Sequence, residues 1–558
     1  MTSDTQRTPT PIDRIAEDWV DTLVDLDPTV GTYIGRTESD GRFGDYSPDG
    51  LEHGVDMARS FIARLDAAAP VDDVDVVTRT DLRSSLALDV ESAEAGLPLR
   101  DLNVIASPAQ GIREVFDLMP TATVADWDTV STRLMALPAA IDGYIQTLRL
   151  GIERGTMPAR RQVQEVILQA RRHAANDGFF AEFAAGARTE SGSLPVSLST
   201  DLGIRARAAA EAYGSLADFL GNELEGRAPS RDAIGRDLYA LQSRRFLGAT
   251  IDLDETYEWG VEELARMVAE QESVADQIKP GASVLEAIAF LDTDPSRKLH
   301  GTDALQKWMQ ETSDRAVAEL SETQFDIPDE ITRLECMIAP TQEGGIYYTG
   351  PTDDFSRPGR MWWSVPVGVT EFDTWRELTT VYHEGVPGHH LQIGQAVYNR
   401  AKLNTWRRQL AGTSGHAEGW ALYAERLMEQ LGYLDDPADR LGMLDGQRMR
   451  AARVVLDIGV HLEKQLPDGS GPWTADYAFD FLGRNVNMNA GFVTFEVNRY
   501  LGWPGQAPSY KVGQRIWEEL RDTYAEREGD AFSIKEFHRK ALDLGGVGLD
   551  TLRAAMLG

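Results

Sequence analysis

The chain has almost no cysteine. Cys336 is the only one in 558 residues, so no disulfide can form within the chain and no metal site can be built from several thiolates. A lone free thiol fits a reducing compartment. The remaining composition is ordinary, with 42% hydrophobic and 26% charged residues. It excludes a disordered, collagen-like or low-complexity chain, and the length is sufficient for a large buried core.

Long hydrophobic runs and an excess of positive charge are missing as well. No stretch approaches the ~18 apolar residues of a membrane-spanning helix, and the first residues contain no apolar leader core. Lys and Arg number 55 against 89 Asp and Glu, a net charge of −34, which repels phosphate backbones and anionic lipid. We therefore expect a cytoplasmic protein that binds neither nucleic acid nor membranes, and the sequence leaves its oligomeric state open.

Several catalytic motifs are also absent. The sequence contains no phosphate-binding G-x-x-x-x-G-K-[ST], no G-x-G-x-x-G following a strand, and no G-x-S-x-G nucleophile turn. These absences argue against nucleotide chemistry and against a serine hydrolase.

Helical periodicity, by contrast, is abundant from residue 10 to about residue 322. Thr10 suits a helix cap and Pro11 the first helical position. The apolar residues that follow recur with the spacing of one helix face: Ile12, Ile15, Ala16, Trp19, Val20 and Leu23.

Between residues 331 and 366 the helical pattern gives way to short runs of β-branched and aromatic residues, separated by Gly, Pro and Asp. This pattern predicts a small sheet. The helical pattern resumes after residue 370. We therefore predict a mainly α fold, with an N-terminal helical region (1–330) and a metal-site region (331–558) forming one continuous body.

The clearest chemical signal is a cluster of histidines. Four of the nine lie within 34 residues, and three belong to the stretch V-Y-H-E-G-V-P-G-H-H-L-Q. In zinc hydrolases of the His-Glu-x-x-His type, two imidazoles one helical turn apart bind the metal, and the Glu takes a proton from water. Here Pro387 occupies the position of the second His. The helix must therefore break at Pro387-Gly388 before His389 or His390 can join His383.

A third ligand is expected from the next predicted helix. Glu418 lies 29 residues after His389 in T-S-G-H-A-E-G-W-A-L-Y-A-E-R-L, beside an apolar face where an unpaired carboxylate would be costly. A bound metal ion would pair with this carboxylate. Glu425, two turns later, could orient a ligand histidine or be a solvated glutamate, and we favour the solvated glutamate.

Four ordered motifs carry a family resemblance. The chain resembles the bacterial domain-of-unknown-function family 885, which shares H-E-x-x-P-G-H-H-x-Q (383–392), G-H-x-E-G-W-A-x-Y-A-E (415–425), R-Y…P-G-Q-A-x-x-Y-K-x-G (499–513) and Y-Y…D…R-P-G (347–359). The family is similar to the helical Glu-zincin peptidases, the group of thimet-type oligopeptidases, angiotensin-converting-type dipeptidases and thermophile-type carboxypeptidases. This resemblance implies an elongated helical body with two lobes around a substrate channel and a small β-sheet beside the metal helix.

The resemblance also implies roles for individual residues. Matching Gly388-His389-His390-Leu391 to the end of the group's zinc motif implies that His383, His389 and Glu418 bind zinc, although His390 could exchange roles with His389. Glu384 would be the general base.

Related peptidases supply an oxyanion donor from a later segment, and Tyr510 fits that position best. Arg499 and Tyr500 are candidates for holding a substrate carboxylate, unless Arg499 pairs with an acid such as Glu496. Tyr348, in the run 344–348, is a candidate for substrate binding along an edge strand, with a plain hairpin strand as the alternative.

The leading hypothesis is therefore a zinc metallopeptidase that cleaves short peptides. The alternatives are a zinc hydrolase acting on a non-peptide amide or ester, and a non-catalytic helical binding protein with a degenerate metal site.

Overall fold

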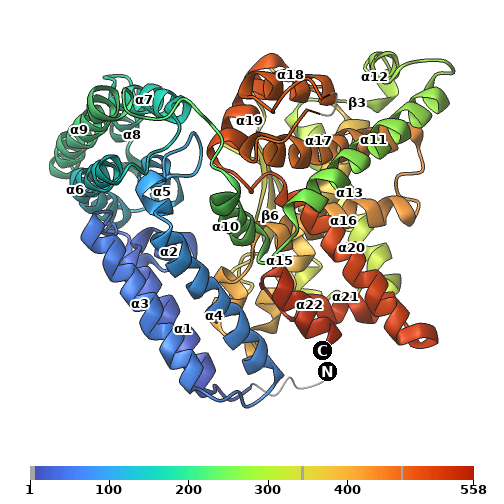
Figure 1. Ribbon diagram of the computed structural model, residues 1–558, viewed down its shortest axis with the longest axis horizontal. Helices are drawn as coiled ribbons and strands as arrows, with labels where there is room; N and C mark the ends of the chain where they lie inside the picture. The colour runs from blue at the N-terminus through green and yellow to red at the C-terminus, as the bar shows by residue number, and fades with distance from the viewer. Residues whose placement is uncertain (1–6, 341–344, 467–468) are drawn as a thin grey trace.

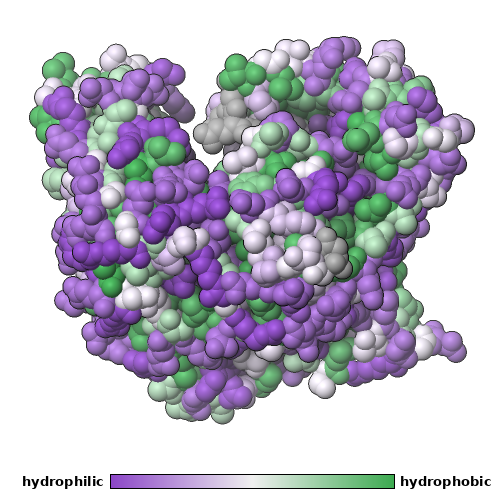
Figure 2. Space-filling model, turned by 45° about the horizontal axis from the view of Figure 1, so that its top comes forward, coloured by the Kyte–Doolittle hydropathy of each residue, from purple (hydrophilic) through white to green (hydrophobic). Residues whose placement is uncertain are grey.

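The computed structural model describes residues 7–340, 345–466 and 469–558. Helices dominate, and the chain forms two lobes that separate at one end and meet at the other (Figure 1). One lobe is made by the first half of the helices, blue to teal in the figure, and the other by the helices from α10 (Arg236–Leu247) onward. The space-filling view shows a notch between the lobes (Figure 2). The mainly α prediction is confirmed.

The first lobe contains two groups of helices. The first group has α1 (Pro11–Leu26), α2 (Pro28–Tyr33), α3 (Pro48–Ala67) and α4 (Asp73–Glu94). The second has α5 (Pro108–Leu118), α6 (Val124–Arg154), α7 (Arg160–Ala174), α8 (Phe179–Ala185) and α9 (Val196–Phe219), with the short strands β1 (Arg188–Thr189) and β2 (Gly192–Ser193). Helix α1 begins as its sequence predicts, because Thr10 accepts a hydrogen bond from the backbone of Asp13.

The second lobe holds the metal-site segments. Its helices after α10 are α11 (Leu253–Ile278), α12 (Val284–Leu291), α13 (Thr302–Thr323), α14 (Thr374–Glu384), α15 (His389–Tyr398), α16 (Ser414–Gln430), α17 (Pro437–His461), α18 (Ala475–Asn485), α19 (Ala490–Gly502), α20 (Ser509–Glu528), α21 (Ile534–Asp543) and α22 (Leu549–Leu557). In the part of the chain that the structure describes, no helix is both long and apolar enough to cross a bilayer.

The sheet lies where the sequence predicts it, directly before the metal-site helices. Strand β6 (Gly359–Trp363) is central, parallel to β4 (Leu334–Ile338) on one side and antiparallel to β5 (Ile346–Thr349) on the other. A separate pair joins β3 (Lys298–His300) to β7 (Glu371–Asp373). Apolar residues of β4 and β6 pack with Val381 of α14, so the sheet supports the helix that carries His383.

The hydrophobic cores divide the chain at a different point from the predicted boundary at residue 330. Residues between 102 and 228 pack around a cluster of their own. Residues from 239 to 325 instead share the main core with the C-terminal half. Helices α1, α3 and α4 pack against Trp406 and Ala411 of the second lobe, and this contact joins the lobes at their closed end. The helices of 239–325 therefore belong with the metal-site lobe.

Candidate metal centre

A break between two helices brings the first two histidines together. Helix α14 ends at Glu384 and α15 begins at His389, with the Gly385–Gly388 turn between them. A Cβ on Gly388 would lie 1.9 Å from the carbonyl oxygen of His383, so the chain can return this closely only through a glycine. The rings of His383 and His389 consequently lie 4.9 Å apart, centre to centre, at 89°. An unbroken helix would separate the two residues by about 9 Å along its axis, which is less than two turns.

Donor atoms from three helices, α14, α15 and α16, converge. Glu418 of α16 places its Oε2 atom 3.2 Å from Nε2 of His383 and 3.6 Å from Nε2 of His389. His383, Glu384 and His389 also offer ligand atoms within 4.8 Å of one another. The structure thus brings together all four residues that the sequence predicts for metal binding and proton transfer.

His390 lies beside His389 in sequence but has different partners. Its Nε2 donates to the carbonyl oxygen of Ile331 at 2.7 Å, and the Tyr348 hydroxyl lies 2.9 Å from its Nδ1. Burial lowers the pKa of His390 to about 4. Both of its nitrogens are therefore occupied by the sheet region, and of the two histidines only His389 reaches Glu418.

Tyr348, predicted to bind substrate, has its hydroxyl on His390. Its strand, β5, is an edge strand of the described sheet, and its neighbour Tyr347 stacks on Trp362. Gly344, the first residue of the predicted run, lies outside the described residues. The contact with His390 makes Tyr348 a link between the sheet and helix α15.

Glu425 corrects an expectation. The sequence favours a solvated glutamate, whereas the side chain is 2% exposed and its Oε1 lies 2.8 Å from Nδ1 of His383. Seven residues are about two helical turns, so Glu425 and Glu418 share one side of α16 and bind opposite nitrogens of the same ring. Gln447 of α17 donates to the second oxygen of Glu425 at 3.1 Å. A carboxylate in this position fixes the ring orientation of a ligand histidine.

The electrostatics of the centre are those of buried charges that balance one another. Burial alone would lower the pKa of His383, but hydrogen bonds with Glu418 and Glu425 outweigh it and raise the pKa to about 10. Burial would raise the pKa of Glu418, but hydrogen bonds with His383 and His389 hold it well below its ordinary value. Burial raises the pKa of Glu384, against the opposing charges of the two histidines. Glu384 therefore has the greatest tendency of these carboxyl groups to hold a proton.

These residues fit a divalent metal ion. Two imidazole nitrogens and a carboxylate oxygen point at one spot, and the far side of one imidazole is held by a second carboxylate. Nδ1 of His389 is buried without a partner among the described residues. Two histidines and one glutamate form a donor set that zinc favours, with a position left for water or substrate. Three carboxylates beside two imidazoles would also be offset by the charge of a cation.

Tyr510 approaches the centre from helix α20. Burial, followed by the negative charge of Glu418, raises the pKa of Tyr510 to about 12, so its hydroxyl keeps its proton at neutral pH and can donate. The guanidinium of Arg453 lies 5.2 Å from the Tyr510 ring centre. The predicted catalytic tyrosine is therefore close enough to sense the charge of a metal donor.

Arg499 and Tyr500 lie in a network behind Tyr510. Arg499 donates to Glu496 at 3.0 Å and to Gln506 at 2.5 Å, which is the acid pairing considered as the alternative. The buried Tyr500 hydroxyl lies between Glu496 and Arg453. Since both side chains already have partners, these contacts fit a positioning role better than direct substrate binding, which stays a prediction.

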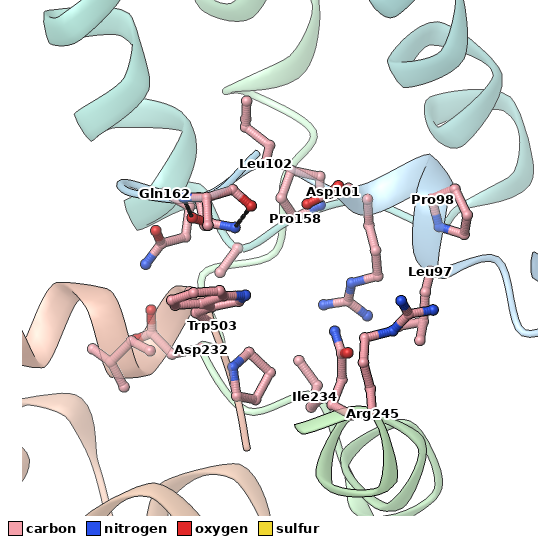
Figure 3. A pocket seen from close by; sticks show the side chains of 18 of the residues that line it. Leu97, Pro98, Asp101, Leu102, Pro158, Gln162, Asp232, Ile234, Arg245 and Trp503 are labelled. Atoms are coloured by element: carbon pink, nitrogen blue, oxygen red, sulfur yellow. Dashed lines mark hydrogen bonds between the residues drawn. The ribbon is translucent and has the colours of Figure 1, made fainter. Parts of the chain in front are cut away.

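A cavity of about 440 Å³ lies between the lobes, close to this network. Figure 3 shows Asp101, Leu102, Pro158 and Gln162 of the first lobe facing Trp503, Asp232, Ile234 and Arg245. The segment Leu501–Pro504 lines the cavity and directly follows Tyr500. Gln162 spans the lobes by donating to the backbone oxygen of Asn498 at 2.9 Å. The cavity thus reaches the chain segment that follows Arg499 and Tyr500.

The chain belongs to the bacterial protein family of unknown function DUF885, whose model matches residues 28–556. Two solved structures share the fold. A “putative lipoprotein” of Colwellia psychrerythraea has a TM-score of 0.84 at 22% identity, covering 99% of each chain. A “putative lipoprotein of unknown function” of Shewanella oneidensis has a TM-score of 0.75 at 18% identity, covering 98% of this chain and 100% of the other.

A carboxypeptidase of Pyrococcus furiosus aligns over 91% of this chain and 95% of its own, with a TM-score of 0.36 and 12% identity. A likeness of that size carries no argument about function. Among curated proteins, none matches the sequence.

Sequence reasoning missed two residues of the centre. Arg453 contacts the Tyr510 ring and the Tyr500 hydroxyl from helix α17. Arg450 lies one turn earlier on the same helix. Burial raises the pKa of Glu384 and of Tyr510, and the positive charge of Arg450 acts against this rise. Neither arginine lies in the histidine motifs. Their positions three and six residues after Gln447 on one helix are the signal that the sequence offers.

Proposed function

We propose that this protein is a metal-dependent hydrolase, and specifically a zinc peptidase that cleaves short peptides. The observation that carries the proposal is the convergence of His383, His389 and Glu418 with Glu384 adjacent, since the nitrogen and oxygen donors lie within 3.2 and 3.6 Å. The three donors would hold zinc, and the ion would supply Lewis acidity to a water molecule and to the substrate carbonyl.

The chain's own residues supply the remaining steps. Glu384 is buried beside both histidines, where its carboxylate takes the proton of the attacking water and passes it to the leaving nitrogen. Tyr510 keeps its hydroxyl proton and donates a hydrogen bond to the carbonyl oxygen as negative charge develops there. Glu425 holds the His383 ring through Nδ1, so that its Nε2 stays directed at Glu418.

Short peptides are the proposed substrates because the donors are buried inside a helical lobe. His383 and Glu384 are 5% and 7% exposed, so a folded protein could not present a peptide bond to them. A small non-peptide amide or ester has the same access and stays the second candidate. We further propose that the protein works in the cytoplasm, apart from nucleic acid and membranes.

The test uses two adjacent histidines as a matched pair. We expect near-stoichiometric zinc in the wild type by mass spectrometry, and its loss from His389→Ala and from Glu418→Ala. His390→Ala removes a neighbouring imidazole that is also buried, at 1% exposure against 9% for His389, but has other partners, so it should keep zinc. If His390→Ala loses zinc and His389→Ala retains it, the ligand assignment is wrong.

Glu384→Gln separates catalysis from binding. We expect this variant to keep its zinc and to lose about 10²–10⁴-fold in turnover of a peptide library, the usual contribution of general acid–base transfer. Cleavage by the wild type should stop when a chelator removes the metal. Zinc binding without cleavage of peptides, amides or esters would favour the non-catalytic binding protein.

A further inference from the structure

Helix α17 presents three polar residues to the centre at helical spacing. Gln447 donates to Glu425, the carboxylate that holds His383. Arg453, six residues later, donates to Glu496 and the Tyr500 hydroxyl and lies against the Tyr510 ring. Arg450 lies between them at i+3 from Gln447, and residues at this spacing are neighbours on a helix surface. Arg450 therefore lies on α17 between the residue that contacts Glu425 and the residue that contacts Tyr510.

Arg450 differs from Arg453 and Arg499 in having no hydrogen-bond or ion-pair partner among the described residues. Arg453 pairs with Glu496 at 2.8 Å, and Arg499 pairs with the same carboxylate at 3.0 Å. Among the residues that the structure describes, Arg450 donates no hydrogen bond and lies within 4.0 Å of no carboxylate, and its Nε is buried without a partner. A guanidinium carries five donors in a planar fork. Arg450 is only partly buried, and Nε is its one donor atom that is buried without a partner among the described residues, so its Nη groups stay accessible to a ligand.

The backbone makes room for this guanidinium. A Cβ on Gly446, one turn before Arg450, would lie 2.6 Å from Nη1. The side chain thus folds back toward the N-terminal end of α17, as helical side chains do. That direction leads toward Gln447 and its contact with Glu425. Electrostatics agree with this placement, since the charge of Arg450 acts on Glu384 and on Tyr510.

We propose that Arg450 binds the free C-terminal carboxylate of a peptide substrate whose scissile bond lies at the metal centre. A carboxylate matches the planar donor fork of a guanidinium in a bidentate pair. The three carboxylates of the centre stay beyond ion-pair distance, which leaves the fork open for an anion from outside. The protein would accordingly shorten peptides from the C-terminal end. This inference rests on the proposed function and names its substrate class.

Binding measured without turnover tests the inference. In zinc-loaded Glu384→Gln protein, calorimetry would compare N-acetyl-trialanine as the free acid and as the C-terminal amide. The acid should bind about 10–100-fold more tightly, the range of a hydrogen bond to a charged group. Adding Arg450→Gln should abolish this preference while leaving amide binding unchanged. A loss of packing alone would weaken both peptides equally.

Two further variants control the result. Arg448→Gln removes an arginine of the same helix that bonds Gln271 and Asn485, and it should leave the preference intact. Gly446→Ala keeps the charge but places a methyl group against Nη1, so it should reduce the preference even if Arg450→Gln does not fold.

Equal binding of acid and amide by the parent, or no binding of either, would overturn the inference. So would a parallel loss of both in Arg450→Gln. Failure of the proposed function gives a different result, in which the acid preference persists but the wild type cleaves no peptide. If the wild type cleaves both peptides at equal rates, the function stands and the inference fails.

Discussion

The bundle at residues 102–228 and the helices α14–α17 bury very different side chains. The bundle packs aromatic and aliphatic residues, with Phe116 in T-shaped, edge-to-face contact with Phe43, Phe180 and Phe183. Helices α14–α17 bury histidines, glutamates, arginines and glutamines, several of which pair with one another, as Glu425 does with His383 and Gln447. Burial of apolar surface is favourable in itself, whereas buried charge needs a complete set of partners. The bundle thus has the composition of a scaffold, and α14–α17 that of a reactive site.

The largest expected effect is a loss of stability when the apolar core of the bundle at residues 102–228 is disrupted. Leu134 is fully buried in α6. Leu134→Ala should lower the free energy of unfolding by about 2–5 kcal/mol, the usual range for a core leucine. Urea unfolding would measure this loss, and zinc content should not change. Met135, its 60% exposed neighbour, is the control and should cost little. Loss of zinc from a folded Leu134→Ala protein would contradict the separation of the two regions.

Tyr510→Phe tests the reactive side. Removing the hydroxyl should lower kcat by about 10²–10³-fold, the effect of losing one oxyanion donor, with stability and zinc content nearly unchanged. Steady-state kinetics on a peptide substrate would measure it. Tyr524→Phe, on the same helix, removes a hydroxyl bonded to Lys540 and should leave kcat unchanged. Equal rates in the wild type and Tyr510→Phe would exclude Tyr510 from the chemistry.

Lowering the pH should weaken the ion pairs around Glu496 and should not affect the apolar packing of the bundle. Burial would raise the pKa of Glu496, but Arg453 and Arg499 outweigh it and lower the pKa to about 2. Since the folded-state pKa lies below the ordinary value of about 4.5, this stabilisation is present above pH ~4.5 and disappears as the pH falls toward 2. It amounts to at most about 3 kcal/mol.

Urea unfolding at pH 6 and at pH 3 would measure this term. The difference in unfolding free energy between the wild type and Glu496→Gln should shrink in acid. A difference that stays constant with pH would show that the carboxylate charge contributes nothing.

The sequence predicted the elements with local signals and missed those that depend on distant contacts. The Thr10-Pro11 helix start, the small sheet and the need for a helix break at Pro387 each follow from a few neighbouring residues. The boundary at residue 330 has no such signal, because the helices at 239–325 join the C-terminal core through packing between segments far apart in sequence.

The candidate site shows the same division. His383, Glu384, His389 and Glu418 are recognisable by type and spacing. The choice between His389 and His390 was open in the residues alone, because it depends on Tyr348 and the backbone of Ile331. Arg450 was missed because the absence of a partner depends on residues that are distant in sequence, and no local pattern indicates it. The burial of Glu425 was missed because its partners come from α14 and α17.

Glu425→Gln gives the smallest and most specific test of the comparison. The amide removes the negative charge on the far side of His383 but keeps the shape of the side chain, so the fold should be retained. Loss of such a carboxylate typically costs about 10–100-fold in metal affinity, and zinc competition with a fluorescent chelator would measure it. Glu429→Gln, one turn later on α16 and paired with Arg426, should leave zinc affinity unchanged. Equal zinc affinity in the wild type and Glu425→Gln would mean that packing alone orients His383. The buried charges of α14–α17 would then contribute to the stability of the fold, as the apolar residues of the bundle do, and not to metal binding.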